Sequence, residues 1–165
     1  EAAVARLAHK WAVRLKRLGY DIDPELLRTA GLLHDIARLK PDHARAGARI
    51  LRMEGYPVMA GIIQCHHRLE GGEESGLTER TLLFLADKMT LEDRMVDIDE
   101  RFRQSAPKCT TPQARENHRL QYNQAQAVRH CLESAMGSLE AADAFGTSPQ
   151  ASVDRKARIR EWAAG

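Results

Sequence analysis

Apolar residues recur at intervals of three and four through almost the whole of this 165-residue chain, and this periodicity constrains the fold more than any other feature. The first stripe comprises Val4, Leu7, Ala8, Trp11, Leu15 and Leu18. Such spacing places side chains on one face of an α-helix, whereas a half-buried strand would show strict alternation. The sequence therefore predicts an all-α fold in which about five helices surround a site and the segment after Pro112 packs outside them.

Capping residues divide the chain into its predicted helices. Gly19 is expected to end the first helix as its C′ residue. Asp23 and Pro24 provide an N-cap and a first-position proline for a second helix, which we expect to continue until Lys40-Pro41-Asp42 breaks it. Further starts are predicted at Gly55-Tyr56-Pro57, Thr78 and Thr111-Pro112. A long helix is predicted from Pro112 to about Ala144, followed by a short basic helix from Ser148-Pro149 through Trp162.

Composition and charge exclude several classes of protein. The 25 lysines and arginines nearly balance the 23 aspartates and glutamates, so there is no basic excess of the kind that nucleic-acid binding requires. No apolar run approaches the roughly 20 residues needed to span a bilayer, and no signal-peptide pattern is present. The three cysteines are widely spaced and read as reduced thiols. We therefore expect a cytoplasmic protein with no membrane partner and no clear nucleic-acid partner.

Histidines and aspartates form an ordered series on the predicted helices. His34 and Asp35 end an apolar run, where a carboxylate without a partner is costly and a metal ion would provide one. His43, the pair His66-His67 and Asp87 follow. Mixed nitrogen and oxygen ligation suits iron or manganese better than a thiolate-dependent zinc site. The series predicts a metal centre. The alternative for His34 and Asp35 is a histidine at the C-terminus of a helix beside an exposed aspartate, and for the later histidines it is a partly buried, hydrogen-bonded side chain.

This ordered series resembles the signature of the HD-domain superfamily of metal-dependent phosphohydrolases, and the resemblance covers roughly residues 1–102. It implies an HD-domain helical bundle over residues 1–105, with additional helices in a C-terminal extension over residues 106–165. It also implies two bound divalent ions, with iron or manganese favoured over magnesium, nickel or zinc. The implied metal ligands are His34, Asp35, His43, His66 and Asp87. Asp35 is expected to bridge both ions and is assigned a catalytic role.

Four other histidines are placed separately. His67 would point about 100° away from its neighbour on a helix, so it is assigned to substrate or to a supporting position. His9 is the histidine of the first helix, but it faces away from the apolar stripe and is expected to face solvent. The first histidine of the superfamily signature is therefore expected just upstream of Glu1. His118 and His130 lie outside the signature and read as ordinary surface or interface side chains.

Cationic side chains near the predicted ligands are candidates for binding phosphate. Lys88 resembles a family position that can contact phosphate, and it is assigned a catalytic role with Asp35. Arg94 can clamp a phosphate through its bidentate donors. Arg38 and Arg68 are weaker candidates for the same task. The alternative for these side chains is an ordinary solvated cation.

Two hypotheses about function follow. The first is a phosphohydrolase that uses metal-activated water on a phosphate ester or anhydride of a nucleotide or related small molecule. The second is a non-catalytic regulatory HD domain that binds a nucleotide or a protein partner. Residues 34–94 resemble small bacterial HD hydrolases, and residues 82–102 resemble HD domains fused to a molybdenum-cofactor-type nucleotidyltransferase. Such a nucleotidyltransferase and a second copy of the chain are therefore considered as partners. The glycine-rich loop over residues 70–76 is expected to border the substrate entrance and to be mobile.

Overall fold

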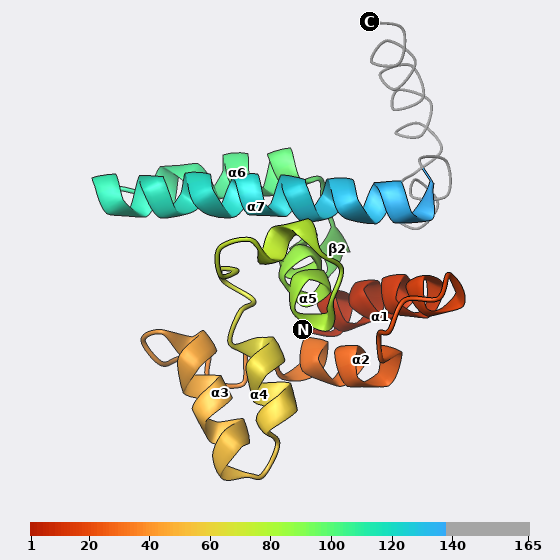
Figure 1. Cartoon of the computed structure of the whole chain (residues 1–165). Coiled ribbons are helices and arrows are strands. Elements are labelled where there is room, and N and C mark those ends of the chain that lie inside the picture. Colours follow the sequence, from red (N-terminus) through yellow and green to blue (C-terminus); the bar gives the residue numbers. More distant parts are fainter. Residues whose placement is uncertain (138–165) are drawn as a thin grey trace, which may run out of the picture.

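The computed structural model describes residues 1–137, and their architecture confirms the predicted all-α fold. This range contains seven α-helices, whose arrangement is shown in Figure 1. They are α1 (Ala2–Arg17), α2 (Pro24–Leu33), α3 (His43–Met53), α4 (Pro57–Ile63), α5 (Glu79–Lys88), α6 (Ile98–Ser105) and α7 (Pro112–Met136). Short elements are the 3₁₀ turns η1 (Glu73–Ser75) and η2 (Ala106–Lys108) and the strands β1 (Thr90–Leu91) and β2 (Arg94–Met95). None of these helices combines the length and apolarity needed to cross a membrane.

α5 lies at the centre of the molecule, in contact with α1, α2, α4 and α7. Five consecutive side chains, Leu82, Leu83, Phe84, Leu85 and Ala86, are fully buried, so this helix is covered on all sides. α1 packs along α2 and α5, and α3 packs against α4. α7 crosses the opposite side of α5, with α6 beside it (Figure 1). The residue that follows the buried run of α5 is Asp87, which is thereby delivered into the interior.

The predicted capping residues are confirmed. Gly19 has φ +91° directly after the first helix, a conformation that a residue with a side chain rarely adopts. Asp23 and Thr111 each accept backbone hydrogen bonds from the first turn of α2 and α7. Thr78 begins α5 with a reciprocal capping box. These boundaries are local features of the sequence, which explains why they are predictable.

Two parts of the backbone differ from the prediction. The second helix ends at Leu33, well before Lys40, because backbone amides within residues 36–40 donate to carbonyls three residues earlier and form successive tight turns. A second difference is the β1–β2 hairpin, which the helical periodicity did not predict. It reverses the chain where Glu92 adopts φ +58°. The first difference affects the site directly, since the His-Asp pair lies in the turns and not on a regular helix.

α7 is joined to the middle of the chain by a buried amide. Gln124 accepts a hydrogen bond from the backbone N of Leu69 at 3.3 Å and donates one to the carbonyl of Leu69 at 3.0 Å. Both backbone groups of a residue close to the His66-His67 pair are thereby satisfied. α7 ends at Met136, and the continuation and the short basic helix predicted beyond it lie outside the described residues.

The close contact between α1 and α2 depends on a glycine, which leads to a stability prediction. A Cβ added to Gly31 would lie 2.6 Å from the Cα and 2.9 Å from the N of Ala5, both backbone atoms. Gly31→Ala should therefore lower the free energy of unfolding by about 1–3 kcal/mol, measured by urea unfolding. Gly61→Ala on α4 is a matched control, because nothing lies within 4 Å of the added Cβ. It should be neutral or stabilising by up to about 1 kcal/mol. Equal stability of the two variants would contradict the close helix contact.

Candidate metal centre

Six side chains of ligand type converge from separate parts of the chain. They are His34 and Asp35 in the turns after α2, His43 at the start of α3, His66 and His67 after α4, and Asp87 near the end of α5. The structure thus brings together all five residues predicted as metal ligands, together with His67. α5 is the buried element on which the other segments meet.

Asp35 faces histidines with both of its carboxylate oxygens. Its Oδ1 lies 3.0 Å from Nε2 of His43 and 3.6 Å from Nε2 of His66. Its Oδ2 lies 3.8 Å from Nε2 of His34, and that nitrogen is also 3.6 Å from Oδ1 of Asp87. One carboxylate therefore joins two neighbouring groups of ligand atoms, one formed with His34 and Asp87 and the other with His43 and His66.

His67 belongs to the second of these groups. Its Nε2 lies 2.6 Å from Nε2 of His43, and Nε2 of His66 lies 3.3 Å from the same atom. One ligand atom from each of the three rings lies within 4.8 Å of the others. The separation of about 100° expected between the His66 and His67 side chains holds only in a regular helix, but α4 ends at Ile63. Adjacent side chains in the following turn can point to the same place.

Backbone contacts set the histidine tautomers in a way that fits metal binding. Nδ1 of His34 donates to the carbonyl of Gly31 at 2.8 Å, and Nδ1 of His66 donates to the carbonyl of Ile63 at 2.7 Å. Because a carbonyl only accepts, Nδ1 carries the proton, and Nε2 of each neutral ring presents a lone pair to the cluster. Several such nitrogens beside two carboxylates form a donor set suited to divalent first-row ions.

The electrostatics of the cluster favour negative carboxylates and a positive charge among them. The neighbouring imidazoles, that of His66 above all, lower the pKa of Asp35 to about 2. Burial lowers the pKa of His67 to about 3, and the ammonium of Lys88 adds to this effect. Burial alone would raise the pKa of Asp87, but the ammonium of Lys88 and the nearby imidazole of His34 hold it well below its usual range. At neutral pH the carboxylates are therefore charged and His67 is neutral, as metal ligation requires.

Lys88 has a buried ammonium that connects two of the ligand-bearing segments. Its side chain is only 7% exposed, and Nζ donates to Oδ2 of Asp87 at 2.9 Å and to the carbonyl of His66 at 3.2 Å. These contacts offset the cost of burying the charge. Lys88 also lines the cavity beside the cluster, so the contact with phosphate predicted for it stays a prediction.

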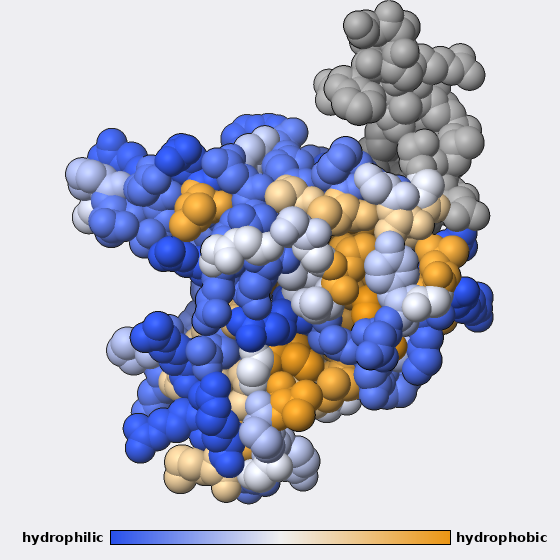
Figure 2. Space-filling view, viewed as in Figure 1, coloured by the Kyte–Doolittle hydropathy of each residue, from blue (hydrophilic) through white to orange (hydrophobic). Residues whose placement is uncertain are grey.

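A cavity of about 270 Å³ opens onto the cluster. One wall carries five of the six ligand-type side chains, all except His34. The other wall is formed by Arg101, Phe102 and Ser105 of α6 and by His118 and Gln121 of α7. His118, expected to be an ordinary surface or interface histidine, accepts or donates a hydrogen bond with Oγ of Ser105 at 2.8 Å and packs against the ring of Phe102. Figure 2 shows a hydrophilic hollow between α3 and the first half of α7. No sequence motif marks this second wall.

The other predicted phosphate-binding cations lie in different places. Arg38 lines the cavity. Arg68 lines an adjoining cavity of about 730 Å³, which shares His67 with the first. Arg94 is not among the side chains that line either cavity and instead pairs with Glu100 at 2.9 Å. Arg101 also lines the first cavity, although the sequence predicted only Arg38, Arg68, Lys88 and Arg94 as phosphate-binding cations.

His9 lies apart from the cluster, in agreement with its predicted orientation away from the apolar stripe. Its Nε2 contacts a carboxylate oxygen of Glu25 on α2 at 3.0 Å, and its side chain is 33% exposed. Among the described residues, the first group of ligand atoms therefore contains three side chains, His34, Asp35 and Asp87.

The glycine-rich loop over residues 70–76 borders the cavity that adjoins the cluster. Glu70 and Gly71 line that cavity together with His67. The backbone N of Glu70 donates to the carboxylate of Glu73 at 2.9 Å, and Glu73 pairs with Arg80 at 3.0 Å. Because Arg80 offsets the charge of Glu73, the loop would repel an anionic ligand less than its three glutamates alone imply.

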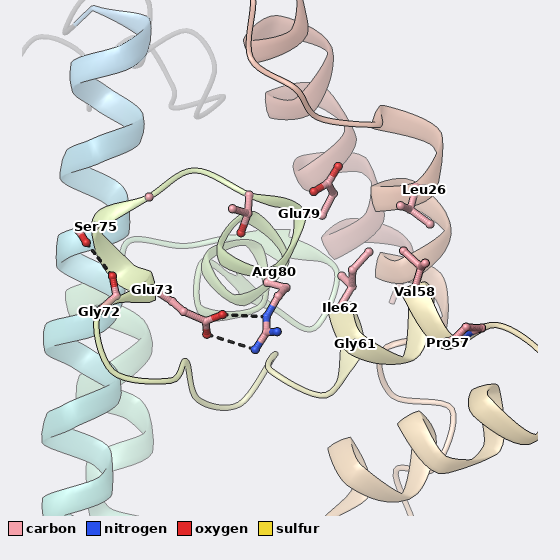
Figure 3. Close-up of a pocket in the computed structure, with 12 residues that line it drawn as sticks. Leu26, Pro57, Val58, Gly61, Ile62, Gly72, Glu73, Ser75, Glu79 and Arg80 are labelled. Atoms are coloured by element: carbon pink, nitrogen blue, oxygen red, sulfur yellow. Dashed lines mark hydrogen bonds and ion pairs between the residues drawn. The ribbon is translucent and has the colours of Figure 1, made fainter.

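A separate cavity of about 670 Å³ also borders this loop (Figure 3). Leu26, Val58 and Ile62 form its apolar side, and Glu73 and Arg80 lie on another side. Figure 2 shows hydrophobic side chains gathered where α4 meets α2. None of the six ligand-type side chains lines this cavity. Its larger volume therefore does not make it the candidate site for metal chemistry.

Comparisons with known proteins agree with this geometry. The model of the HD domain family matches residues 2–100, the segment that carries all six ligand-type side chains. A Methanocaldococcus jannaschii protein, named as uncharacterized, is 35% identical in an alignment 102 residues long that covers 57% of this chain and 58% of that protein. The chain thus spans less than two thirds of the length of this relative. No solved structure matches.

Proposed function

Because this chain belongs to the HD-domain family, we propose that it is a metal-dependent phosphohydrolase that cleaves a phosphate ester or anhydride of a nucleotide or related small molecule. The observation that carries the proposal is the position of Asp35, whose Oδ2 faces His34 and whose Oδ1 faces His43 and His66. Two ligand sets joined by one carboxylate are what a pair of adjacent ions requires.

The residues present fit two ions of different surroundings. His34, Asp35 and Asp87 would hold one ion, and Asp35, His43, His66 and His67 would hold the other. When bound, divalent ions would polarise phosphoryl oxygens and lower the pKa of water. The nitrogen and oxygen donors favour iron or manganese over magnesium, and the absence of a thiolate among these ligands argues against a structural zinc site. Lys88 donates hydrogen bonds to Asp87 and to the backbone carbonyl of His66, and so fixes the two segments relative to each other.

The access to the cluster supports an enzyme over the non-catalytic regulatory alternative. A structural metal site is usually closed by its protein ligands, whereas a catalytic site keeps an open position. Here the side chains of Asp35 and His43 are 17% and 23% exposed, and a cavity opens directly onto them. A small molecule could therefore reach the cluster.

The adjoining cavity supports a substrate with an organic group larger than a phosphate. It holds about 730 Å³, and His67 lines both cavities. Its lining is mainly polar and includes Gln64, Arg68 and Asn117. Such side chains can hydrogen-bond a sugar or a base, which is why we propose a nucleotide or a related compound.

The test combines metal content with phosphate release. The purified chain would be stripped with a chelator, reloaded separately with iron, manganese, magnesium, nickel or zinc, and assayed on nucleoside phosphates and dinucleoside polyphosphates. We expect about two ions per chain and phosphate release with iron or manganese that a chelator abolishes. Nucleotide binding without hydrolysis of any compound, in the fully loaded protein, would favour the regulatory alternative.

A further inference from the structure

We propose that Arg101 of α6 binds a phosphoryl group of the substrate from the cavity wall opposite the metal ligands. This assignment rests on the proposed function, because it takes the occupant of the cavity to be a phosphate compound. Arg101 lies just beyond the range that the HD-domain model matches, so the family match does not assign it. It also differs from Arg94, the phosphate clamp expected from the sequence.

The guanidinium of Arg101 lacks a protein partner. Its Nε is buried without a hydrogen bond, and no ion pair or hydrogen bond joins the guanidinium to any side chain or backbone group within residues 1–137. Acidic neighbours on α6 are engaged elsewhere, since Glu100 pairs with Arg94 and Asp99 accepts a hydrogen bond from the Tyr122 hydroxyl at 2.8 Å. A guanidinium remains charged at any physiological pH, and a buried donor without an acceptor is costly. An anionic ligand in the cavity would supply the counter-charge that this guanidinium lacks.

The wall that carries Arg101 is held firmly by its neighbours. Phe102, the next residue, is buried, and its ring packs edge-on against that of Tyr122 on α7, with centroids 5.4 Å apart. α7 is in turn attached through Gln124 to Leu69, two residues after the His66-His67 pair. The guanidinium therefore projects from a helix that packed side chains connect to the ligand-bearing segment. A binding group on such a support keeps a defined position better than one on a loop.

The charges of the two walls are complementary to a phosphate compound held between them. Asp35 and Asp87 on one wall favour metal cations, whereas Arg101 on the other favours an anion. The ammonium of Lys88 already donates to Asp87 and to the carbonyl of His66, but the planar fork of Arg101 has its donors available. That fork matches two oxygens of one phosphoryl group. Arg101 can therefore orient a phosphate without taking part in metal ligation.

The direct test is orthophosphate binding to the full chain loaded with Mn²⁺, measured by isothermal titration calorimetry. Arg101→Ala should weaken phosphate binding roughly 10- to 100-fold, as expected for loss of charge-assisted hydrogen bonds. The manganese content should stay unchanged, because the guanidinium contacts none of the ligand-type side chains. Arg103→Ala is the matched control, since Arg103 is an exposed arginine of the same helix that does not line the cavity. It should bind phosphate as the wild type does.

A second variant covers the case in which Arg101→Ala impairs folding. Arg101→Lys keeps the charge and the aliphatic stem but loses the planar fork, so it should bind phosphate several-fold more weakly than the wild type. Unchanged affinity in the Arg101 variants, an equal loss in Arg103→Ala, or no phosphate binding by the loaded wild type would each overturn the assignment.

Failure of the proposed function would look different from failure of this inference. If the wild type binds phosphate through Arg101 but releases none from any ester or anhydride, the hydrolase proposal fails and the role of Arg101 stands. If esters are hydrolysed with the same kcat and KM by the wild type and by Arg101→Ala, the hydrolase proposal stands and Arg101 has no part in substrate binding.

Discussion

Asp35→Ala should remove both metal ions from the chain and abolish phosphate release. Its Oδ1 faces His43 at 3.0 Å and its Oδ2 faces His34 at 3.8 Å, so the substitution takes one ligand from each position at once. The other carboxylate, Asp87, contacts only His34 among the histidines of the cluster. Changes to residues that merely support a metal ligand often cost 10- to 100-fold in metal affinity or activity, and loss of a shared ligand should cost more than about 100-fold.

The measurement is elemental analysis of the purified variant, together with phosphate release from the best substrate of the wild type. Asp93→Ala provides the matched control, because Asp93 is an exposed aspartate in the turn between β1 and β2, away from the cavity. It should keep the wild-type metal content and rate. Two ions retained by Asp35→Ala would show that Asp35 does not join the two groups of ligands.

Lys88→Met should strongly lower the stability of the metal-free protein. The side chain of Lys88 is 7% exposed, and its removal leaves the carboxylate of Asp87 without its ammonium partner. Removing one member of a buried ion pair typically costs about 3–5 kcal/mol. For a chain of this size, that corresponds to a fall of roughly 10 °C in Tm. Methionine preserves the unbranched stem, so the lost charge and hydrogen bonds account for most of the effect.

Thermal unfolding followed by circular dichroism checks this expectation, with Lys16→Met as the control for an exposed lysine on α1. The control should change Tm by about a degree or less. Loading with Mn²⁺ should reduce the loss in Lys88→Met, since an ion beside Asp87 replaces part of the missing positive charge. A Lys88→Met protein that is as stable as the wild type but has a raised KM would instead support the phosphate contact predicted from the sequence.

The sequence alone determined the features that depend on neighbouring residues. Asp23, Thr78 and Thr111 were identifiable as N-caps because a capping side chain bonds the first turn of its own helix. The all-α class followed from the apolar periodicity, which each helix shows over its own length. The ordered series from His34 to Asp87 could be recognised for a different reason. It resembles a family signature, and recognising that resemblance requires no knowledge of tertiary contacts.

Only the tertiary structure decided which side chains share the cavity. His67 joins the cluster because α4 ends at Ile63 and a turn, not a helix, directs its ring. Arg101 and His118 line the cavity because α7 crosses α5 and α6 packs against α7, and no local pattern encodes that arrangement. Helices that are distant in the sequence come together because their apolar faces are buried against each other. The periodicity of the sequence identifies the apolar face of each helix, but it does not show which other helix will cover that face.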